Sequence, residues 1–143
     1  MHSNCYGESV SSQELIENAK LYNGKEVLFQ GEVIGNVMQR GKYSWVNIHD
    51  GKNALGIFVK NEIISGIVFK GDYGHKGDIV AVEGIFHRAC SMHGGDLDIH
   101  ATKITKIKDG TTIRHVPHPA KIKIVLWLGL ILIFSVIVMI IKR

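Results

Sequence analysis

The C-terminal end of the sequence has a hydrophobic pattern unlike that of the rest. Residues 124–141 read IVLWLGLILIFSVIVMII, an uncharged run whose single polar side chain is Ser135. As a helix this run would be about 27 Å long, which matches the hydrocarbon thickness of a bilayer. The remaining residues are too few to enclose a helix that is apolar on every side. We therefore predict one transmembrane helix over 124–141, with the lipid bilayer as a partner.

The residues before this run begin with a helical pattern. Ser11 and Glu14 have the spacing of an N-terminal capping box, and Leu15 and Tyr22 belong to one apolar side of the predicted helix. Gly24 suits the left-handed position that ends a helix. A single helix that ends before Gly24 is therefore expected.

Five extended segments follow, over residues 25–38, 43–49, 54–60, 79–87 and 97–108. Gly31 and Gly35 interrupt the first segment and predict a bulge or sharp bend within it. The second segment alternates, with Ser44, Val46 and Ile48 on one side and the rings on the other. The sequence DGKN after it indicates a hairpin turn, and residues 61–76 have room for a short helical turn.

The order of these elements predicts a mainly β fold. Helices do not alternate with the strands, which argues against a parallel α/β sheet. A chain this short must close or cover its sheet edges, and five bent strands do so as a Greek-key barrel. We predict an N-terminal segment and helix over 1–22, a barrel over 23–109, a stalk over 110–123 and the membrane helix over 124–141.

Four stretches make a resemblance specific: NGKEVLFQGEV, YSWVNIHDG, KGDIVAVEGIF and DIHATKI. In this order they resemble the strands of an OB-fold domain, of the nucleic-acid-binding type found in anticodon-binding domains. They are also similar to small bacterial membrane-linked OB-fold proteins. The resemblance covers about Asn23 to Lys108 and implies a five-stranded barrel that binds a ligand. It indicates the fold better than the ligand, because one fold serves many functions.

The charge distribution limits the classes of ligand. Residues 1–109 carry 12 basic and 13 acidic side chains, whereas residues 110–143 carry 5 basic and no acidic ones, which gives the total of +4. A nearly neutral barrel argues against a strongly basic nucleic-acid binder, because affinity for phosphates rises with the number neutralised. Another membrane or envelope protein, or an envelope polymer, is therefore an alternative partner.

One face of the predicted hairpin carries aromatic rings. Tyr43 and Trp45 share a strand face, and Phe58 lies near them on the next strand. OB-fold domains bind single-stranded nucleic acid by stacking bases on such rings within a basic groove. The resemblance therefore implies a nucleic-acid surface that is bordered by Arg40, Lys42, Lys52 and Lys60. Alternatively, these rings pack against the N-terminal helix or belong to the core.

The loop after the fourth segment gathers possible metal ligands. His87, Cys90 and His93 are three residues apart, and Asp98 and His100 share the outer face of the next strand. Thiolate, imidazole and carboxylate groups are zinc ligands, and four converging donors would complete a tetrahedral site. We name His87, Cys90, His93 and His100 as candidate ligands, with zinc as the one candidate cofactor. The alternative is a polar hairpin loop with a free cysteine, since no paired CxxC motif is present.

The sequence does not favour an enzyme. Cys90 could pair with His87 or His93, with Asp96 and Asp98 as supporting acids. No residues indicate an oxyanion hole, a phosphate loop or a dinucleotide motif. We therefore expect a binding module rather than a catalyst.

The side of the membrane stays open at this stage. Three basic residues, Arg114, Lys121 and Lys123, precede the helix and two follow it, so the positive-inside rule favours a cytoplasmic domain by one charge. The sequence as written starts without a signal peptide, which agrees with that side. A start site further upstream, with a signal peptide, would instead place the domain outside.

Overall fold

The computed structural model of the protein describes residues 8–114 and 119–142. The chain divides after Ile113 into two compact units, a β-rich domain and a C-terminal helix. The predicted leader, which contains Cys5, and the stalk residues 115–118 lie outside the described residues.

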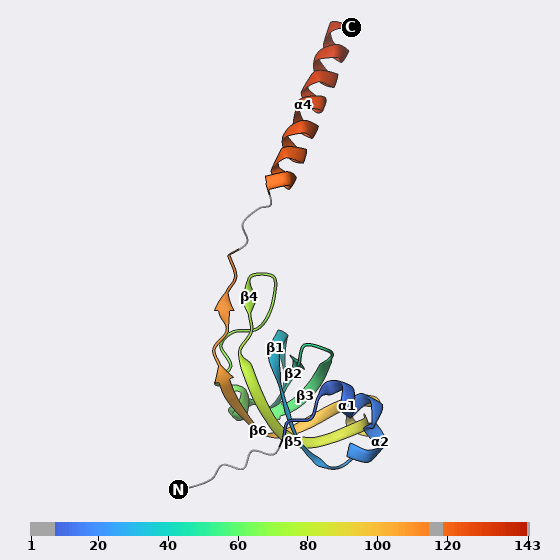
Figure 1. Ribbon diagram of the computed structural model, residues 1–143, viewed down its shortest axis with the longest axis vertical. Helices are drawn as coiled ribbons and strands as arrows, with labels where there is room; N and C mark the ends of the chain where they lie inside the picture. The colour runs from blue at the N-terminus through green and yellow to red at the C-terminus, as the bar shows by residue number, and fades with distance from the viewer. Residues whose placement is uncertain (1–7, 115–118, 143) are drawn as a thin grey trace. The chain divides into compact units, whose positions relative to one another are not determined.

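The β-rich domain is a closed five-stranded barrel, as predicted (Figure 1). Hydrogen bonds join the strands in the order β1-β2-β3-β6-β5, where β3 and β6 run parallel and all other neighbours are antiparallel. The strand bounds are β1 Glu26–Arg40, β2 Tyr43–His49, β3 Ala54–Lys60, β5 Ile79–Cys90 and β6 Asp96–Lys108. Closure of the barrel pairs the edges of its five strands with one another.

Alternation along the strands fills the barrel. Val46 and Ile48 of β2 point inward with Ile57 of β3, and all three are fully buried. Phe29 and Phe86 are the largest fully buried side chains, and truncation of either to Ala would cost about 3–5 kcal/mol. The predicted alternation of β2 is therefore confirmed, with Ser44, Val46 and Ile48 inside the barrel and the rings on the outer side.

Two glycines allow β1 to pair with two neighbouring strands. The first half of β1 pairs with β5, and the second half pairs with β2. A β-carbon at Gly31 would collide with the backbone of His49 at the crossing. Gly35 has φ +67° at the register shift between Ile34 and Met38, which is the predicted bulge.

Two strands run further than the sequence pattern indicates. β1 continues to Arg40, because Arg40 pairs with Tyr43 across a tight turn. β5 continues to Cys90, which pairs with Asp96 beyond an irregularity in the ladder. The predicted loop after His87 is therefore shorter, and the 3₁₀ turn η1 Ser91–His93 occupies most of it.

The predicted N-terminal helix is divided into α1 Ser12–Glu17 and α2 Ala19–Tyr22. Asn18 separates them, because its backbone leaves the helical region and its side chain donates to Glu14. Ser11 caps α1 as predicted. Leu15 is fully buried, whereas the neighbouring Ile16 is exposed.

A small second sheet lies beside the barrel. The predicted short helical turn is α3 Asn61–Ile64, and the following loop contains β4 His75–Lys76, which pairs with β7 Thr111–Thr112. Part of the predicted stalk is therefore strand. Asp78 lies at the base of this loop and is fully buried.

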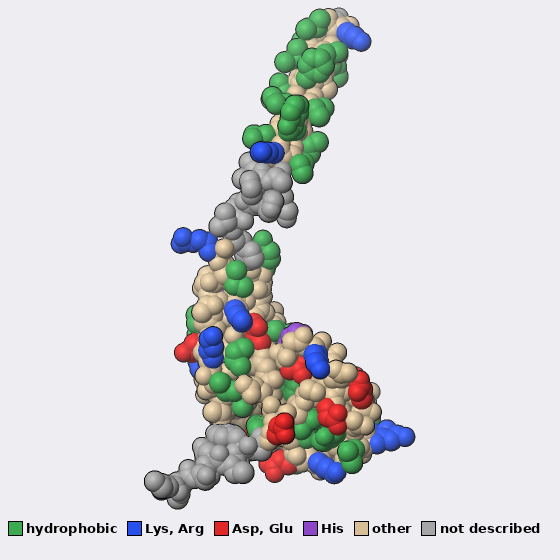
Figure 2. Space-filling view, viewed as in Figure 1, with side chains coloured by type: hydrophobic (Ala, Val, Ile, Leu, Met, Phe, Trp, Pro, Cys, Tyr) green, Lys and Arg blue, Asp and Glu red, His purple; other side chains and the backbone are tan. Residues whose placement is uncertain are grey.

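The C-terminal unit is one helix, α4 Pro119–Ile141. It begins five residues before the predicted start at Ile124, because Pro119 suits the first turn of a helix. The 19 residues Lys123–Ile141 are long and apolar enough to cross a bilayer. Hydrophobic side chains cover its visible face, with a basic side chain near each end (Figure 2). Ser135 donates to the backbone oxygen of Leu132, which satisfies its hydroxyl within the helix.

Candidate functional site

The outer face of the barrel carries a row of side chains that crosses four strands. Met38 of β1 pairs with Trp45 of β2, Trp45 with Phe58 of β3, and Phe58 with His100 of β6. An adjacent row contains Arg40, Tyr43 and Lys60, which pair in the same way. Directly opposite side chains on one face interact, so these rows form one continuous surface.

The aromatic rings of this surface contact one another. Tyr43 and Phe58 are stacked, with ring centroids 4.7 Å apart and planes 16° from parallel. Tyr43 is 39% exposed, whereas Trp45 and Phe58 are partly buried. The Trp45 ring lies over Gly56, where any β-carbon would collide with it, and its indole N–H donates to Asn47. The rings therefore lie on the outer side of the barrel, which excludes the alternative that they belong to the core.

Three of the four predicted cations border the rings. Arg40 and Lys60 flank Tyr43 across the sheet, and Lys42 precedes it in the turn. Lys52 lies in the β2–β3 turn at the opposite end of the hairpin, where its ammonium donates to Gln13 of α1. The structure therefore does not bring Lys52 to the aromatic surface.

Two hollows border the rings. One, of about 620 Å³, is lined by Lys42, Tyr43, Lys60 and Glu62 among others. The second, of about 480 Å³, is lined by Met38, Arg40, Trp45, Met92, His93, Gly94 and Asp96. Each is wide enough for a small ligand group, and each also contains one carboxylate, which weakens its attraction for phosphate.

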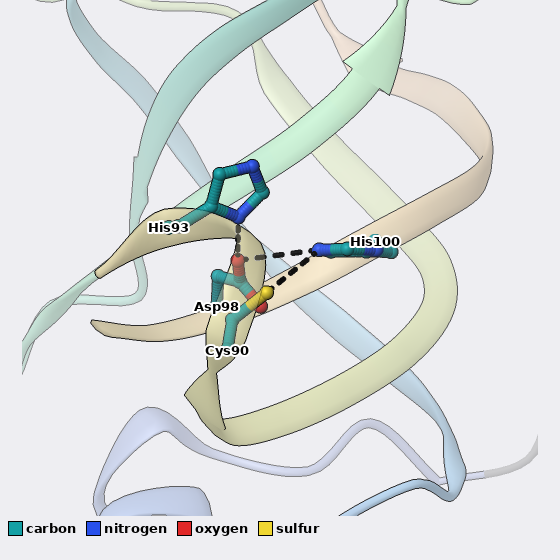
Figure 3. A group of neighbouring side chains, drawn as sticks. All are labelled: Cys90, His93, Asp98 and His100. Carbon is teal, nitrogen blue, oxygen red and sulfur yellow. Dashed lines mark hydrogen bonds and ion pairs between the residues drawn. The ribbon is translucent and has the colours of Figure 1, made fainter. Parts of the chain in front are cut away.

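The second cluster on this face consists of Cys90, His93, Asp98 and His100 (Figure 3). Cys90 ends β5, His93 lies in η1, and the other two lie on β6. One potential ligand atom of each residue lies within 4.8 Å of those of the other three. Three of the four predicted metal ligands are therefore brought together, and Asp98 is the fourth member.

Direct contacts link the four side chains. The Sγ of Cys90 lies 3.4 Å from the Nε2 of His100, and this nitrogen lies 3.3 Å from the Oδ2 of Asp98. The Nδ1 of His93 forms a hydrogen bond with the same carboxylate oxygen. Asp98 therefore lies at the centre of the cluster.

Asp98 is fully buried, although it lies at an outward position of β6. The loop that contains η1 covers it from outside, which the alternation of β6 alone does not predict (Figure 3). Its Oδ1 has no hydrogen-bond partner among the residues that the structure describes. A buried carboxylate oxygen without a partner is costly, which marks this position as unusual.

His87 is not part of this donor set. It pairs with Asp98 in the β5–β6 ladder, but its ring packs against that of His100 with centroids 4.4 Å apart. The irregularity in the ladder between His87 and Cys90 turns the thiol toward the cluster and leaves His87 beside it. His87 can therefore position His100 but is not placed as a ligand.

Burial also affects the acid–base behaviour of the cluster. Burial raises the pKa of the Cys90 thiol, and the nearby Asp98 carboxylate raises it further. Burial lowers the pKa of His100 more strongly than the charge of Asp98 raises it. Without a bound cation, the thiol is therefore protonated and His100 is neutral near pH 7.

The aromatic surface and the cluster are contiguous. The ring of His93 packs edge-on against Trp45 at 5.0 Å and tilted against Phe58 at 4.5 Å. Phe58 also contacts His100, with centroids 5.2 Å apart. Two sites that the sequence predicts separately are therefore one surface. Met38 and Met92, which line the adjoining hollow, could not be recognised from the sequence, because exposed methionines carry no signal of their own.

Comparison with solved structures supports the fold. The chain is similar to a putative aspartyl-tRNA synthetase from Leishmania major, with 20% identity and a TM-score of 0.55 over 82% of this chain and 24% of that one. It is also similar to asparaginyl-tRNA synthetase from Pyrococcus horikoshii, with 24% identity and a TM-score of 0.51 over 78% and 25%. A third match is an OBody bound to hen egg-white lysozyme, with 17% identity and a TM-score of 0.53 over 74% and 100%.

These likenesses concern the fold alone, and they confirm the predicted OB-fold. The chain spans about a quarter of the length of the two synthetases. No protein-family model matches the sequence, and a search of curated proteins finds no match. The protein is thus an OB-fold barrel followed by an apolar helix that could span a membrane.

Proposed function

We propose that the protein is a membrane-anchored OB-fold module that binds single-stranded nucleic acid without catalysis. The observation that carries this proposal is the stacked pair of Tyr43 and Phe58, flanked by Arg40 and Lys60 on the outer face of β2–β3. This face of an OB-fold is where oligonucleotides and oligosaccharides bind. Stacked rings give single strands a platform, because every base has a π-face.

Electrostatics make the expected binding weak and salt-sensitive. Arg40, Lys42 and Lys60 supply positive charge at the rings, but Glu62 and Asp96 line the same hollows. The barrel as a whole carries almost no net charge. Stacking must therefore provide most of the affinity, and the slope of affinity against salt should reflect no more than about three phosphates.

The membrane part of the proposal rests on α4. Lys123 and Lys142 lie at the two ends of its apolar stretch, where their ammonium groups can reach the headgroups. We expect the full chain to stay in the membrane fraction through alkaline carbonate extraction. A chain that lacks residues 124–143 should be released in soluble form, and retention of that shorter chain in the membrane would contradict the anchor.

Binding can be measured with the full chain in nanodiscs of zwitterionic lipid. A fluorescent single-stranded oligonucleotide should show raised anisotropy at low salt. The exposed ring allows a clean test, because Tyr43→Ala removes a stacking partner without opening the core. The expected loss is about 1–3 kcal/mol, or about 5–150-fold in affinity.

Two lysines provide a matched pair of charge variants. Lys60→Ala should weaken binding and lower the salt slope by about 1, because it removes one phosphate contact. Lys52→Ala removes the same charge at the opposite end of the hairpin and should leave both unchanged. Equal effects of the two variants, or no binding of the full chain at low salt, would contradict the proposal. Preferential binding of an oligosaccharide or an envelope protein would assign the face to that partner instead.

A further inference from the structure

We propose that Cys90, His93, Asp98 and His100 form a binding site for a zinc-class divalent metal ion. This site is independent of nucleic-acid binding, because it requires no ligand on the exposed part of the aromatic surface. Three elements supply the donors, namely the end of β5, the turn η1 and the strand β6.

The distances between the donor atoms fit one bound ion. Zinc–ligand bonds of about 2.0–2.3 Å place the corners of a tetrahedron about 3.3–3.8 Å apart. Two separations lie in this range, 3.4 Å between Cys90 and His100 and 3.3 Å between His100 and Asp98. The contact between His93 and Asp98 is shorter than this range and would have to lengthen around an ion. The longest separation among the four donor atoms is no more than 4.8 Å. Small side-chain rotations therefore suffice to place all four around one ion.

The surroundings of Asp98 also favour a bound cation. Its carboxylate is completely buried, its Oδ2 is shared by two histidines, and its Oδ1 has no hydrogen-bond partner among the described residues. A buried carboxylate needs a compensating cation or a full set of hydrogen bonds. A divalent ion between Asp98, the imidazoles and the thiol would supply that charge.

The backbone and neighbouring rings hold the donors in place. Gly94 and Gly95 both have positive φ, at 74° and 92°, and they reverse the chain directly after His93. This reversal returns the chain to β6, so that His93 faces Asp98 across the turn. Trp45 and Phe58 pack against His93, and His87 packs against His100. Both imidazoles are thus oriented by neighbouring rings, as metal-binding histidines require support from outside the donor set.

The donor set indicates the class of ion. One thiolate and two imidazoles favour zinc or cobalt over calcium or magnesium, which prefer oxygen donors. Four protein donors leave no open coordination position, as in structural zinc sites rather than catalytic ones. The ion is therefore expected to hold η1 and the histidine rings in place beneath the aromatic surface.

The test uses the full chain in detergent micelles, purified without a histidine tag. Metal analysis should find near-stoichiometric zinc, or uptake of zinc by chelator-treated protein to that level. Cobalt should replace zinc and give the intense visible bands of a four-coordinate site, together with a thiolate-to-cobalt charge-transfer band. Cys90→Ser should abolish the charge-transfer band, and Asp98→Asn should reduce metal affinity by more than the 10–100-fold typical of supporting residues.

Two histidine variants serve as matched controls. His87→Ala changes a supporting ring and should lower affinity by about 10-fold at most, with full occupancy at high metal concentration. His93→Ala removes a ligand and should lose the tetrahedral spectrum. Circular dichroism confirms that each variant keeps its strands. A folded wild-type chain that takes up neither zinc nor cobalt would overturn the proposal, as would equal metal binding by the His87 and His93 variants.

Discussion

Two buried aspartates on the barrel are held in opposite ways. Asp78 and Asp98 are both fully buried. Both oxygens of Asp78 accept hydrogen bonds, at 2.7–3.2 Å, from the backbone N–H groups of Gly110, Val68 and Phe69. The ammonium of Lys106 lies 3.6 Å from the same carboxylate. Within the described part of the chain, the hydrogen-bond partners of the Asp98 carboxylate are two histidine side chains, which share one of its oxygens.

This difference distinguishes a carboxylate with a structural role from one that can bind a metal ion. The backbone donors around Asp78 belong to the loop before β5 and to the residue that precedes β7, so its carboxylate fixes those segments to the barrel. Titratable side chains and a thiol surround Asp98, and all of them can bind a metal ion. Burial alone therefore does not identify a functional carboxylate, whereas the kind of partner does.

The largest expected effect is the loss of Asp78. Asp78→Ala leaves three backbone N–H groups without their acceptor and should lower the free energy of unfolding by about 3–5 kcal/mol. Chemical unfolding of the full chain in micelles measures this, with Trp127→Phe as the background so that fluorescence reports Trp45 alone. The matched variant Asp98→Ala, measured with chelator, should cost far less, because only one oxygen of the Asp98 carboxylate accepts hydrogen bonds, and only from side chains. Equal losses would remove the distinction between the two aspartates.

Zinc should produce the next largest effect, and only at Asp98. At a concentration 100 times its dissociation constant, a ligand that binds only the folded state adds about 2.7 kcal/mol to the free energy of unfolding. We expect this gain in the wild-type chain and in Asp78→Asn, provided that the latter is folded. Asp98→Asn should show no gain at the same zinc concentration. A gain in Asp98→Asn would place the ion elsewhere.

Most of the fold could be predicted from the sequence, because each face of a strand leaves its own alternation. Val46 and Ile48 against Tyr43 and Trp45 define the inner and outer faces of β2 without any tertiary information. Gly35 likewise indicates the bulge in β1. Strand ends were less predictable, since β1 and β5 continue only where a neighbouring strand provides partners.

The composition of the metal cluster could be predicted only in part. Sequence spacing brought Cys90, His93 and His100 into one loop region, but it also favoured His87 over Asp98. That Asp98 and not His87 belongs to the cluster depends on the irregular β5–β6 register near Cys90 and on the loop that contains η1. Neither the irregular register nor this loop produces a periodic pattern in the sequence. The contact of His93 with the aromatic rings could not be predicted either, because it joins segments that are distant in sequence.

A third aspartate tests whether hydrogen bonds alone can hold a carboxylate ionised. Burial of Asp50 would raise its pKa, but donors from Ser12, Lys52 and Asn53 lower it from 3.8 to about 2. A lowered pKa in the folded state stabilises the protein above the ordinary value, and this contribution disappears as the pH falls from about 4 to about 2. Asp50→Asn should cost about 1.5 kcal/mol at pH 7 and much less at pH 2. Unfolding curves at both pH values measure the difference, and a pH-independent loss would contradict it.

The smallest expected loss of stability comes from Lys106, and it tests whether hydrogen bonds or the ion pair stabilise the Asp78 carboxylate. Burial would raise the pKa of Asp78, but the N–H groups of Gly110, Val68 and Phe69 lower it more than the charge of Lys106 does. Lys106 also binds Asp109 at 2.9 Å and is partly exposed, so solvent screens its attraction. Lys106→Met should therefore cost no more than about 1 kcal/mol, and Asp78 should still titrate below its ordinary pKa. A loss as large as that of Asp78→Ala would make the ion pair the dominant interaction, and the two buried aspartates would then differ only in the cation that each requires.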